Sequence, residues 1–151
     1  MDVHSRETRS YNMSQIRNKN TKPEEIVRKY LFSCGLRYRK NDKRLPGHPD
    51  IVLPKHKTVV FVNGCFWHVH EGCKYFKWPE SNMDFWKNKL TENKRRDVVK
   101  IQALKELGWK VIIVWECELK RDKQITIAIL LISANSRCVE SPFAIIRTYC
   151  F

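Results

Sequence analysis

The stretch that decides the fold is Thr58-Val-Val-Phe-Val-Asn-Gly-Cys-Phe-Trp-His-Val-His-Glu-Gly-Cys73. It opens with β-branched and aromatic residues, which predict a buried strand that ends at Asn63-Gly64. Candidate metal ligands follow the strand at Cys65, His70 and Cys73. Thiolate and imidazole are ligands that Zn²⁺ prefers, and these short spacings suit one tetrahedral ion.

A closed tetrahedral site needs a fourth ligand, and a second apolar run offers one. Residues 110–117 read as another strand, which ends at Cys117, and residues 84–107 read as a helix. If this helix is the crossover between two parallel strands, Cys65 and Cys117 fall at the same edge of the sheet. We therefore expect a structural Zn²⁺ bound by Cys65, His70, Cys73 and Cys117. Disulfides or unliganded thiols are the alternatives.

The charge of the chain favours a polyanionic partner. Its 151 residues, which we expect to form one domain over 1–151, hold 29 Lys and Arg against 16 Asp and Glu, a net charge of +13. Such a charge suits nucleic acid first and an anionic membrane surface second. We see no run of roughly 20 apolar residues that could span a membrane and no secretory signal, so we expect a reducing compartment. Three further cysteines are expected to be buried or free thiols: Cys34, Cys138 and Cys150.

The two ends of the chain are read differently. Residues 1–20 are basic around Met13 and Ile16. They form either a loosely ordered arm or an arm that inserts these two side chains into a DNA groove. Residues 125–132 are an apolar helix or strand, and residues 133–151 form a tail to which we assign no role.

A helix and a hairpin precede the deciding stretch. Thr21 caps a helix that ends before Gly35, and Glu24 is expected to complete its capping box. Residues 36–40 read as a strand. A hairpin between 50–54 and 58–62 then places Asp50 opposite Phe61 or Val62, close to Asn63 and His68.

Asp50 and His68 suggest phosphodiester hydrolysis. A carboxylate can hold a hard cation such as Mg²⁺, and a neutral histidine beside it can accept a proton from the attacking water. Two plainer readings stay open: Asp50 as a turn residue, and His68 as the zinc ligand in place of His70.

Aromatic and basic side chains surround this site. At least one of Phe66 and Trp67 should be exposed, where it could act as a wedge between base pairs. A basic helix surface, which is either solvated or in contact with phosphate, consists of Lys89, Lys94, Arg95 and Arg96.

Several motifs together resemble one family. They are Thr8-Arg-Ser-x-Asn-Met13, Asn20-Thr-Lys-Pro-Glu24, Leu45-Pro-Gly-His-Pro-Asp50, Val60-Phe-Val-Asn-Gly-Cys-Phe-Trp-His68, His70-Glu-Gly-Cys73, Phe85-Trp86, Asn93-x-x-Arg-Asp97, Gly108-Trp109 and Trp115-Glu-Cys117. From about Val3 to Leu119 the chain resembles the very short patch repair (Vsr) mismatch endonucleases. The resemblance implies a restriction-endonuclease-like α/β fold with a central mixed sheet, flanking helices and one structural zinc site. It also implies Mg²⁺-dependent nicking of DNA 5′ to the T of a T·G mismatch left by deamination of 5-methylcytosine.

The resemblance also implies roles for individual residues. Asp50 and the carbonyl of Val62 would bind Mg²⁺, Glu24 would reach the metal through water, and His68 would be the general base. Phe66, Trp67 and Trp86 would form a wedge on the major-groove side of the DNA. Met13 and Ile16 would enter from the minor-groove side. Lys89 and Asn93 would read the mismatch. The zinc ligands would be the four residues inferred above.

Two departures accompany the resemblance. Asn63, which we include among the catalytic residues, stands where the family usually has a second histidine, and no match continues after Leu119. The alternatives are a restriction-type nicking nuclease of other specificity, or a catalytically weak, zinc-stabilised DNA-binding protein. We expect a monomer acting on double-stranded DNA in the bacterial cytoplasm at the nucleoid, with mismatch-repair proteins as candidate partners and no membrane contact.

Overall fold

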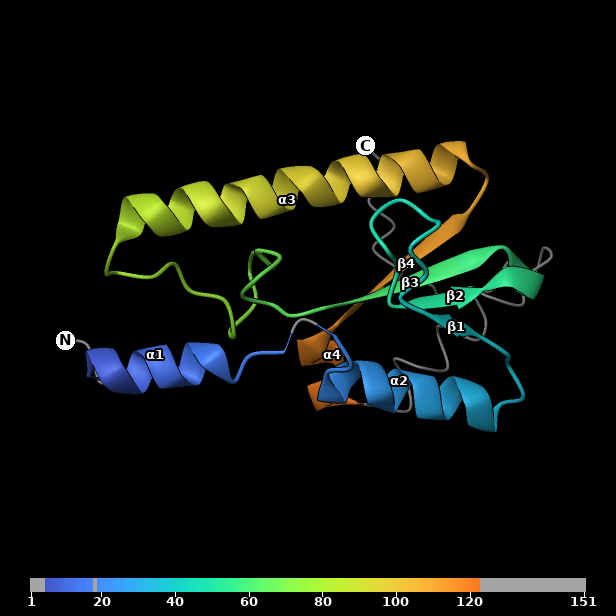
Figure 1. The fold of residues 1–151 in the computed structure, drawn as a ribbon, viewed down its shortest axis with the longest axis horizontal. Coiled ribbons are helices and arrows are strands. Elements are labelled where there is room, and N and C mark those ends of the chain that lie inside the picture. Colours follow the sequence, from blue (N-terminus) through green and yellow to red (C-terminus); the bar gives the residue numbers. More distant parts are fainter. Residues whose placement is uncertain (1–4, 18, 123–151) are drawn as a thin grey trace.

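The structure is a mixed four-stranded sheet with helices on both faces (Figure 1). This computed structural model describes residues 5–17 and 19–122; the apolar segment 125–132, the tail 133–151, Cys138 and Cys150 lie outside the described residues. The strand order is β1-β2-β3-β4, with bounds Arg39–Lys40, Ile51–Leu53, Thr58–Asn63 and Lys110–Trp115. The helices are α1 (Arg6–Ser14), α2 (Lys22–Ser33), α3 (Met83–Glu106) and α4 (Glu116–Arg121), with a 3₁₀ turn at Pro54–His56.

The strand pairing confirms the predicted hairpin and the predicted parallel crossover. β2 is antiparallel to β3, with Ile51 opposite Val60. β3 is parallel to β4 over its whole length, from Thr58 opposite Lys110 to Asn63 opposite Trp115. α3 connects these two strands, as a parallel pair requires.

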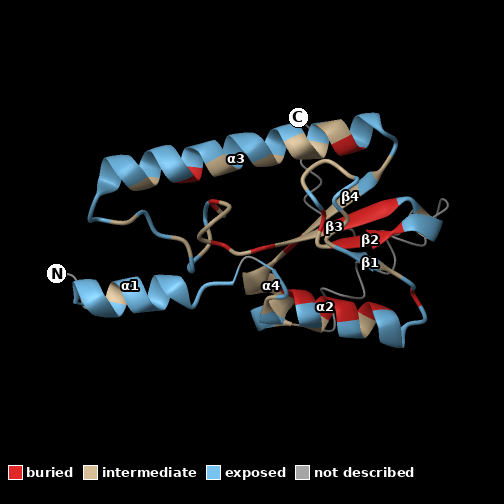
Figure 2. Cartoon of the chain, viewed as in Figure 1, coloured by how far each residue is buried: buried red, intermediate tan, exposed pale blue. Residues whose placement is uncertain are grey.

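Alternation along the strands sends apolar side chains to both faces. In β2, Ile51 and Leu53 join the core that includes Val27 and Leu31 of α2, whereas Val52 joins a second cluster with Leu104 of α3. The buried segments of β2 and β3 lie between α2 and α3 (Figure 2). This two-sided burial explains why the strands read as continuous apolar runs rather than as alternating ones.

Two of the predicted helices end as expected. Gly35 and Gly108 have φ values of +77° each, which a residue without a Cβ adopts at little cost. The N–H of Leu36 bonds to the carbonyl of Leu31, and that of Trp109 to the carbonyl of Leu104. Both ends are therefore Schellman motifs, as the glycines predicted.

Three local predictions need correction. The strand expected over 36–40 is reduced to Arg39–Lys40. Residues 6–14 form a helix with Ser5 as its N-cap rather than a loosely ordered arm, and every residue of this helix is half-buried or exposed. Cys117 lies in the first turn of α4 rather than at the end of a strand.

The long helix α3 extends well past the sheet (Figure 1). Of its 24 residues, Leu90 and Leu104 are the buried ones. In the view of Figure 1, α1 extends on the same side as the free part of α3, and the loop 64–82 lies between them. Among the described helices, none has the length and apolar composition needed to cross a membrane.

Candidate active site and metal centre

Asp50 lies at the mouth of the β2–β3 hairpin. Its Oδ2 accepts a hydrogen bond of 2.8 Å from the backbone N–H of Val62. Burial, together with the nearby carboxylate of Glu24, raises the pKa of Asp50 to about 6 against the opposing effects of the Val62 N–H, Arg28 and His68. A buried carboxylate beside a second carboxylate is stabilised by a bound cation. The site therefore fits a divalent metal.

Glu24 belongs to a buried network at the start of α2. Its Oε2 accepts from the Asn20 N–H at 3.0 Å and from Nη2 of Arg28 at 2.8 Å, and its Oε1 accepts from the Thr21 hydroxyl at 3.0 Å. Glu24 thus satisfies groups at the helix start, although it bonds to the Asn20 N–H rather than to that of Thr21 as a capping box would. Arg28 also donates to the carbonyl of Asp50 at 3.1 Å. The network ties α2 directly to the candidate catalytic residue.

His68 faces α3 rather than the cysteines. Its Nδ1 lies 2.5 Å from Oδ2 of Asp97, and the other carboxylate oxygen, Oδ1, lies 3.7 Å from the Lys100 ammonium. A carboxylate on one ring nitrogen fixes the orientation of the imidazole and leaves the other nitrogen for proton transfer. This dyad is the arrangement that a general base requires.

Val69 separates the two histidines and has a φ of +52°. A β-branched residue in this region is strained, at a cost on the order of 1–3 kcal/mol. The resulting turn lets His68 contact Asp97 while His70 joins the cysteine cluster. The structure therefore places His70, and not His68, with the candidate zinc ligands.

Asn63 ends β3 on the face toward α3. It is 7% exposed and lines a small cavity with Asp97, Lys100 and Ile101. Its neighbours are thus the partner of His68 and a lysine. The amide could hydrogen-bond to a phosphate or a water in this position, but it could not exchange a proton.

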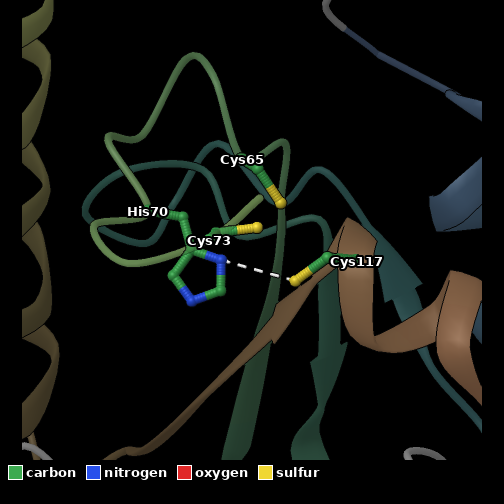
Figure 3. A group of neighbouring side chains, drawn as sticks. All are labelled: Cys65, His70, Cys73 and Cys117. Carbon is green, nitrogen blue, oxygen red and sulfur yellow. Dashed lines mark hydrogen bonds between the residues drawn. The ribbon is translucent and has the colours of Figure 1, made fainter. Parts of the chain in front are cut away.

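The four predicted zinc ligands converge at the same edge of the sheet (Figure 3). Their ligand atoms all lie within 4.8 Å of one another, and Sγ of Cys117 lies 3.4 Å from Nδ1 of His70. Tetrahedral ligands with Zn–S bonds of about 2.3 Å lie about 3.8 Å apart. Small side-chain shifts would therefore close the cluster around one ion. The converging ligands are Cys65, His70, Cys73 and Cys117.

The thiols of this cluster are suited to a cation. Burial raises the pKa of Cys65, and burial together with the neighbouring thiols raises the pKa of Cys117 to about 12. A metal ion reverses this preference by binding the thiolates. All three cluster thiols are free, as is Cys34, which is exposed at the end of α2.

The indole of Trp115 stacks on His70 with ring centroids 4.0 Å apart and so orients this candidate ligand.

The predicted wedge forms an aromatic cluster. Phe66 lies 5.1 Å from Trp67 and 5.5 Å from Trp86 between ring centroids, and Trp67 lies 6.0 Å from Trp86. All three side chains are half-buried, so the pair Phe66–Trp67 is partly accessible rather than split between core and solvent. This partial exposure is compatible with insertion between bases.

The other predicted DNA contacts lie on α1 and α3. Met13 and Ile16 are 41% and 48% exposed. Lys89 is exposed above the ring of Phe85. Asn93 already uses its amide, because Nδ2 donates to the Trp67 carbonyl at 3.2 Å and Oδ1 accepts from Arg96 at 2.6 Å. To read a base, Asn93 must give up or share one of these bonds.

The basic surface of α3 is partly paired within the protein. Lys94 lies 2.9 Å from a carboxylate oxygen of Glu71, and Arg95 lies 2.8 Å from one of Glu92. These are exposed pairs, which contribute little to stability. Both side chains are therefore available to exchange their carboxylate partners for phosphate.

Sequence reasoning did not assign Asp97 and Arg28 to the site. Asp97 stood within a quoted motif, but nothing in its spacing indicated contact with a histidine 29 positions earlier. Arg28 lies one turn after Glu24 on α2, a spacing that by itself predicts only an intrahelical ion pair.

Comparison with known proteins decides the family. The family described as DNA mismatch endonuclease Vsr matches residues 1–74. The type II nicking enzyme V.NmeAIP of Neisseria meningitidis is 55% identical over 119 residues, 79% of this chain and 84% of the relative. The DNA mismatch endonuclease Vsr of Escherichia coli is 43% identical over 125 residues, 83% of this chain and 80% of the relative. This chain belongs to the Vsr family. The type II nicking enzyme V.XorIIP of Xanthomonas oryzae is 50% identical over 115 residues, 76% of this chain and 84% of the relative.

Membership of the Vsr family confirms the predicted enzyme class. The chain is a DNA endonuclease, a hydrolase of mismatch repair. The mixed sheet with flanking helices is consistent with an α/β nuclease fold. A Vsr nuclease is expected to use a divalent metal, and the Cys and His cluster could bind a metal of its own.

Proposed function

We propose that this protein is a Mg²⁺-dependent endonuclease with a restriction-endonuclease-like fold that nicks one DNA strand 5′ to the T of a T·G mismatch. The observation that carries the proposal is the position of Asp50, bonded to the Val62 N–H and close to the His68–Asp97 pair. The name of the Escherichia coli relative, a mismatch endonuclease, supports a mismatch as the substrate.

Asp50 and the carbonyl of Val62 would hold Mg²⁺, and Glu24 would reach it through water. The bound ion would stabilise the negative charge that develops on the phosphate during hydrolysis. Arg28 keeps this cluster of carboxylates together, since it donates both to Glu24 and to the Asp50 carbonyl.

His68 would act as the general base. Asp97 holds its Nδ1, so Nε2 would accept the proton of the attacking water, and the imidazolium that forms would be stabilised by the same carboxylate. Asn63 would position the phosphate or the water through its amide. The reaction cleaves one P–O bond and requires no further co-reactant besides water.

DNA would be held between the two helices that extend beyond the sheet. Met13 and Ile16 would enter the minor groove, and Phe66, Trp67 and Trp86 would enter from the major-groove side. Lys89 and Asn93 would read the mismatch. The exposure of these side chains and the charge of +13 support this arrangement.

The cysteine and histidine cluster would hold a structural Zn²⁺. Four protein ligands leave no open position, so the ion would stabilise the loop that follows β3 rather than react. This loop carries both His68 and the aromatic cluster, and zinc would thereby support catalysis indirectly. With chromosomal DNA as its substrate, we place the enzyme in the bacterial cytoplasm as a monomer.

Cleavage of labelled duplexes tests the proposal. Duplexes that differ at one position (T·G, T·A, C·G or C·A) are incubated with Mg²⁺, and the product ends are mapped. We expect one nick, 5′ to the T of the T·G duplex alone. Equal cleavage of paired duplexes would instead favour a restriction-type nicking nuclease of other specificity; two of the relatives above are named type II nicking enzymes. Tight binding without cleavage would favour the DNA-binding alternative that Asn63 suggests.

A further inference from the structure

The aromatic cluster extends along the loop that follows the candidate zinc ligands. Phe76 lies 6.4 Å from Phe66, and Trp78 lies 5.2 Å from Phe76 in an edge-to-face arrangement of 74°. The rings therefore form a continuous row from Trp86 on α3 through Phe66 and Phe76 to Trp78. Phe76 is half-buried and packs edge-to-face against the ring of Trp78.

Trp78 is far more exposed than an indole of the core would be. Its exposed fraction is 44%. Large aromatic side chains usually remove most of their surface from water, and a row of partly exposed rings often marks a binding surface. The function proposed above uses only the other end of this row.

Two exposed lysines lie in the loop that holds Trp78. Lys77 precedes Trp78 and Lys74 lies four residues before it, while the acids of the loop are Glu71, which pairs with Lys94, and Glu80. The Lys74 ammonium lies 5.0 Å from the ring centre of Tyr75. An exposed aromatic ring beside lysines is the combination that proteins use to stack on a nucleobase while binding its phosphates.

We propose that Trp78 stacks on a nucleobase of the DNA substrate, next to the step that Phe66, Trp67 and Trp86 open. This inference rests on the proposed function, because it assumes that the aromatic row faces the mismatched duplex. A base has an aromatic face whatever its identity, so the stacking contact adds affinity with little dependence on sequence. Lys77 holds the adjoining phosphate.

Three variants separate stacking from charge and from folding. Trp78→Ala removes the ring, Trp78→Phe keeps an aromatic face, and Phe32→Ala is the matched control. Phe32 is 57% exposed on α2, and within the described part of the chain its ring interacts with the Arg37 guanidinium, far from the aromatic row. Affinity for a T·G duplex is measured by titration at several salt concentrations, and thermal unfolding is followed for each variant.

Trp78→Ala should weaken binding about 5- to 150-fold, the range that corresponds to loss of one base–aromatic stack. The slope of log affinity against log salt should stay unchanged, because stacking releases no counterions. Lys77→Ala should reduce that slope by about 0.9, the value for one phosphate. Trp78→Phe and Phe32→Ala should both bind within about threefold of the wild type.

Two further measurements probe the base itself, and the first uses only the wild type, so that it does not depend on the folding of a variant. 2-Aminopurine is placed in turn at the positions flanking the mismatch, and its fluorescence in complex with the wild type should be quenched at one of them. An abasic site at that position should weaken wild-type binding and leave Trp78→Ala unaffected.

Trp78→Ala with wild-type affinity, or the absence of quenching at every flanking position, would overturn the inference. If the wild type nicks T·G duplexes and these results are obtained, only the role of Trp78 fails. If the wild type neither binds nor nicks T·G duplexes in preference to paired ones, the proposed function itself fails.

Discussion

The backbone N–H of Val62 donates a hydrogen bond of 2.8 Å to Oδ2 of Asp50. This contact joins the residue that precedes β2 to the penultimate residue of β3, so the hairpin register directly sets the position of the carboxylate. Burial and Glu24 nevertheless raise the pKa of Asp50 to about 6. The hydrogen bond therefore fixes the position of the candidate catalytic carboxylate, while its surroundings disfavour its charged form.

Asp50→Asn should stabilise the protein in Mg²⁺-free buffer that retains zinc. The folded-state pKa of about 6 exceeds the ordinary value of 3.8, so the folded state binds this proton more tightly than the unfolded state. The contribution of the Asp50 carboxyl to stability is therefore largest below about pH 4, and it is lost as the pH rises from about 4 to 6. The asparagine can still accept the Val62 hydrogen bond and carries no charge. At pH 8 the free energy of unfolding should rise by about 2–3 kcal/mol.

Urea denaturation of both proteins at pH 4 and pH 8 tests this expectation. The gain should shrink toward zero at pH 4, where the wild-type carboxyl is protonated. An Asp50→Asn protein that is less stable than the wild type at pH 8 would show that the carboxylate is not destabilised by its surroundings.

Asp97→Asn should slow nicking about 100-fold without a comparable change in DNA affinity. The amide cannot stabilise the imidazolium of His68 as the carboxylate does, so proton transfer loses its support. Asp84→Asn at the start of α3 is the matched control, since Asp84 is exposed in the first turn of the same helix. Single-turnover rates and binding titrations give the two quantities. Equal rates for Asp97→Asn and Asp84→Asn would exclude a role for the dyad.

Cys117→Ala should lose bound zinc and several kcal/mol of folding free energy, because a four-ligand ion contributes its binding energy to folding. Cys34→Ala should keep the bound zinc and the folding free energy of the wild type, since Cys34 is exposed at the end of α2. Elemental analysis and thermal unfolding follow the two effects. We expect one Zn²⁺ per chain in the wild type and in Cys34→Ala. A fully active, stable Cys117→Ala protein would show that this metal centre is dispensable.

Asn63→His should raise the single-turnover rate. It restores the proton-transferring side chain that the family usually carries, in a position beside Asp97 and Lys100. Lys100 is partly exposed and can move to admit the larger ring. Asn63→Ala, which removes the amide, should not produce the gain. A properly folded Asn63→His enzyme slower than the wild type would mean that this chain uses the amide itself.

The sequence predicted the parts of the fold that depend on local pattern. The apolar runs of β3 and β4, the glycines after α2 and α3 and the hairpin turn each have a short-range signal, and together they placed Asp50, Cys65 and Cys117 at one edge. Two elements had no comparable signal. α1 has no buried residue, so its sequence shows no apolar pattern at helical spacing. Cys117 follows an apolar strand so closely that the sequence does not show where α4 begins.

The side-chain partners of the site could not be predicted because they depend on tertiary packing. The rotation and position of α3 over the loop 64–73 decide that Asp97, rather than another residue of the helix, meets His68. Burial of Arg28 between α2 and Asp50 depends in the same way on how α2 packs on the sheet. Helical spacing alone gives neither contact.

The central claim is that Asp50 forms the metal-dependent catalytic site for nicking at a T·G mismatch. Single-turnover cleavage of one labelled T·G duplex by the wild type and by Asp50→Asn, over a range of Mg²⁺ concentrations, tests it most directly. We predict that the wild type nicks the T-containing strand only when Mg²⁺ is present. Asp50→Asn should bind the duplex within about threefold of the wild type and fail to nick it at any Mg²⁺ concentration, because the metal stabilises the transition state more than the bound substrate. Nicking by Asp50→Asn at the wild-type rate, or Mg²⁺-independent nicking by the wild type, would contradict the claim.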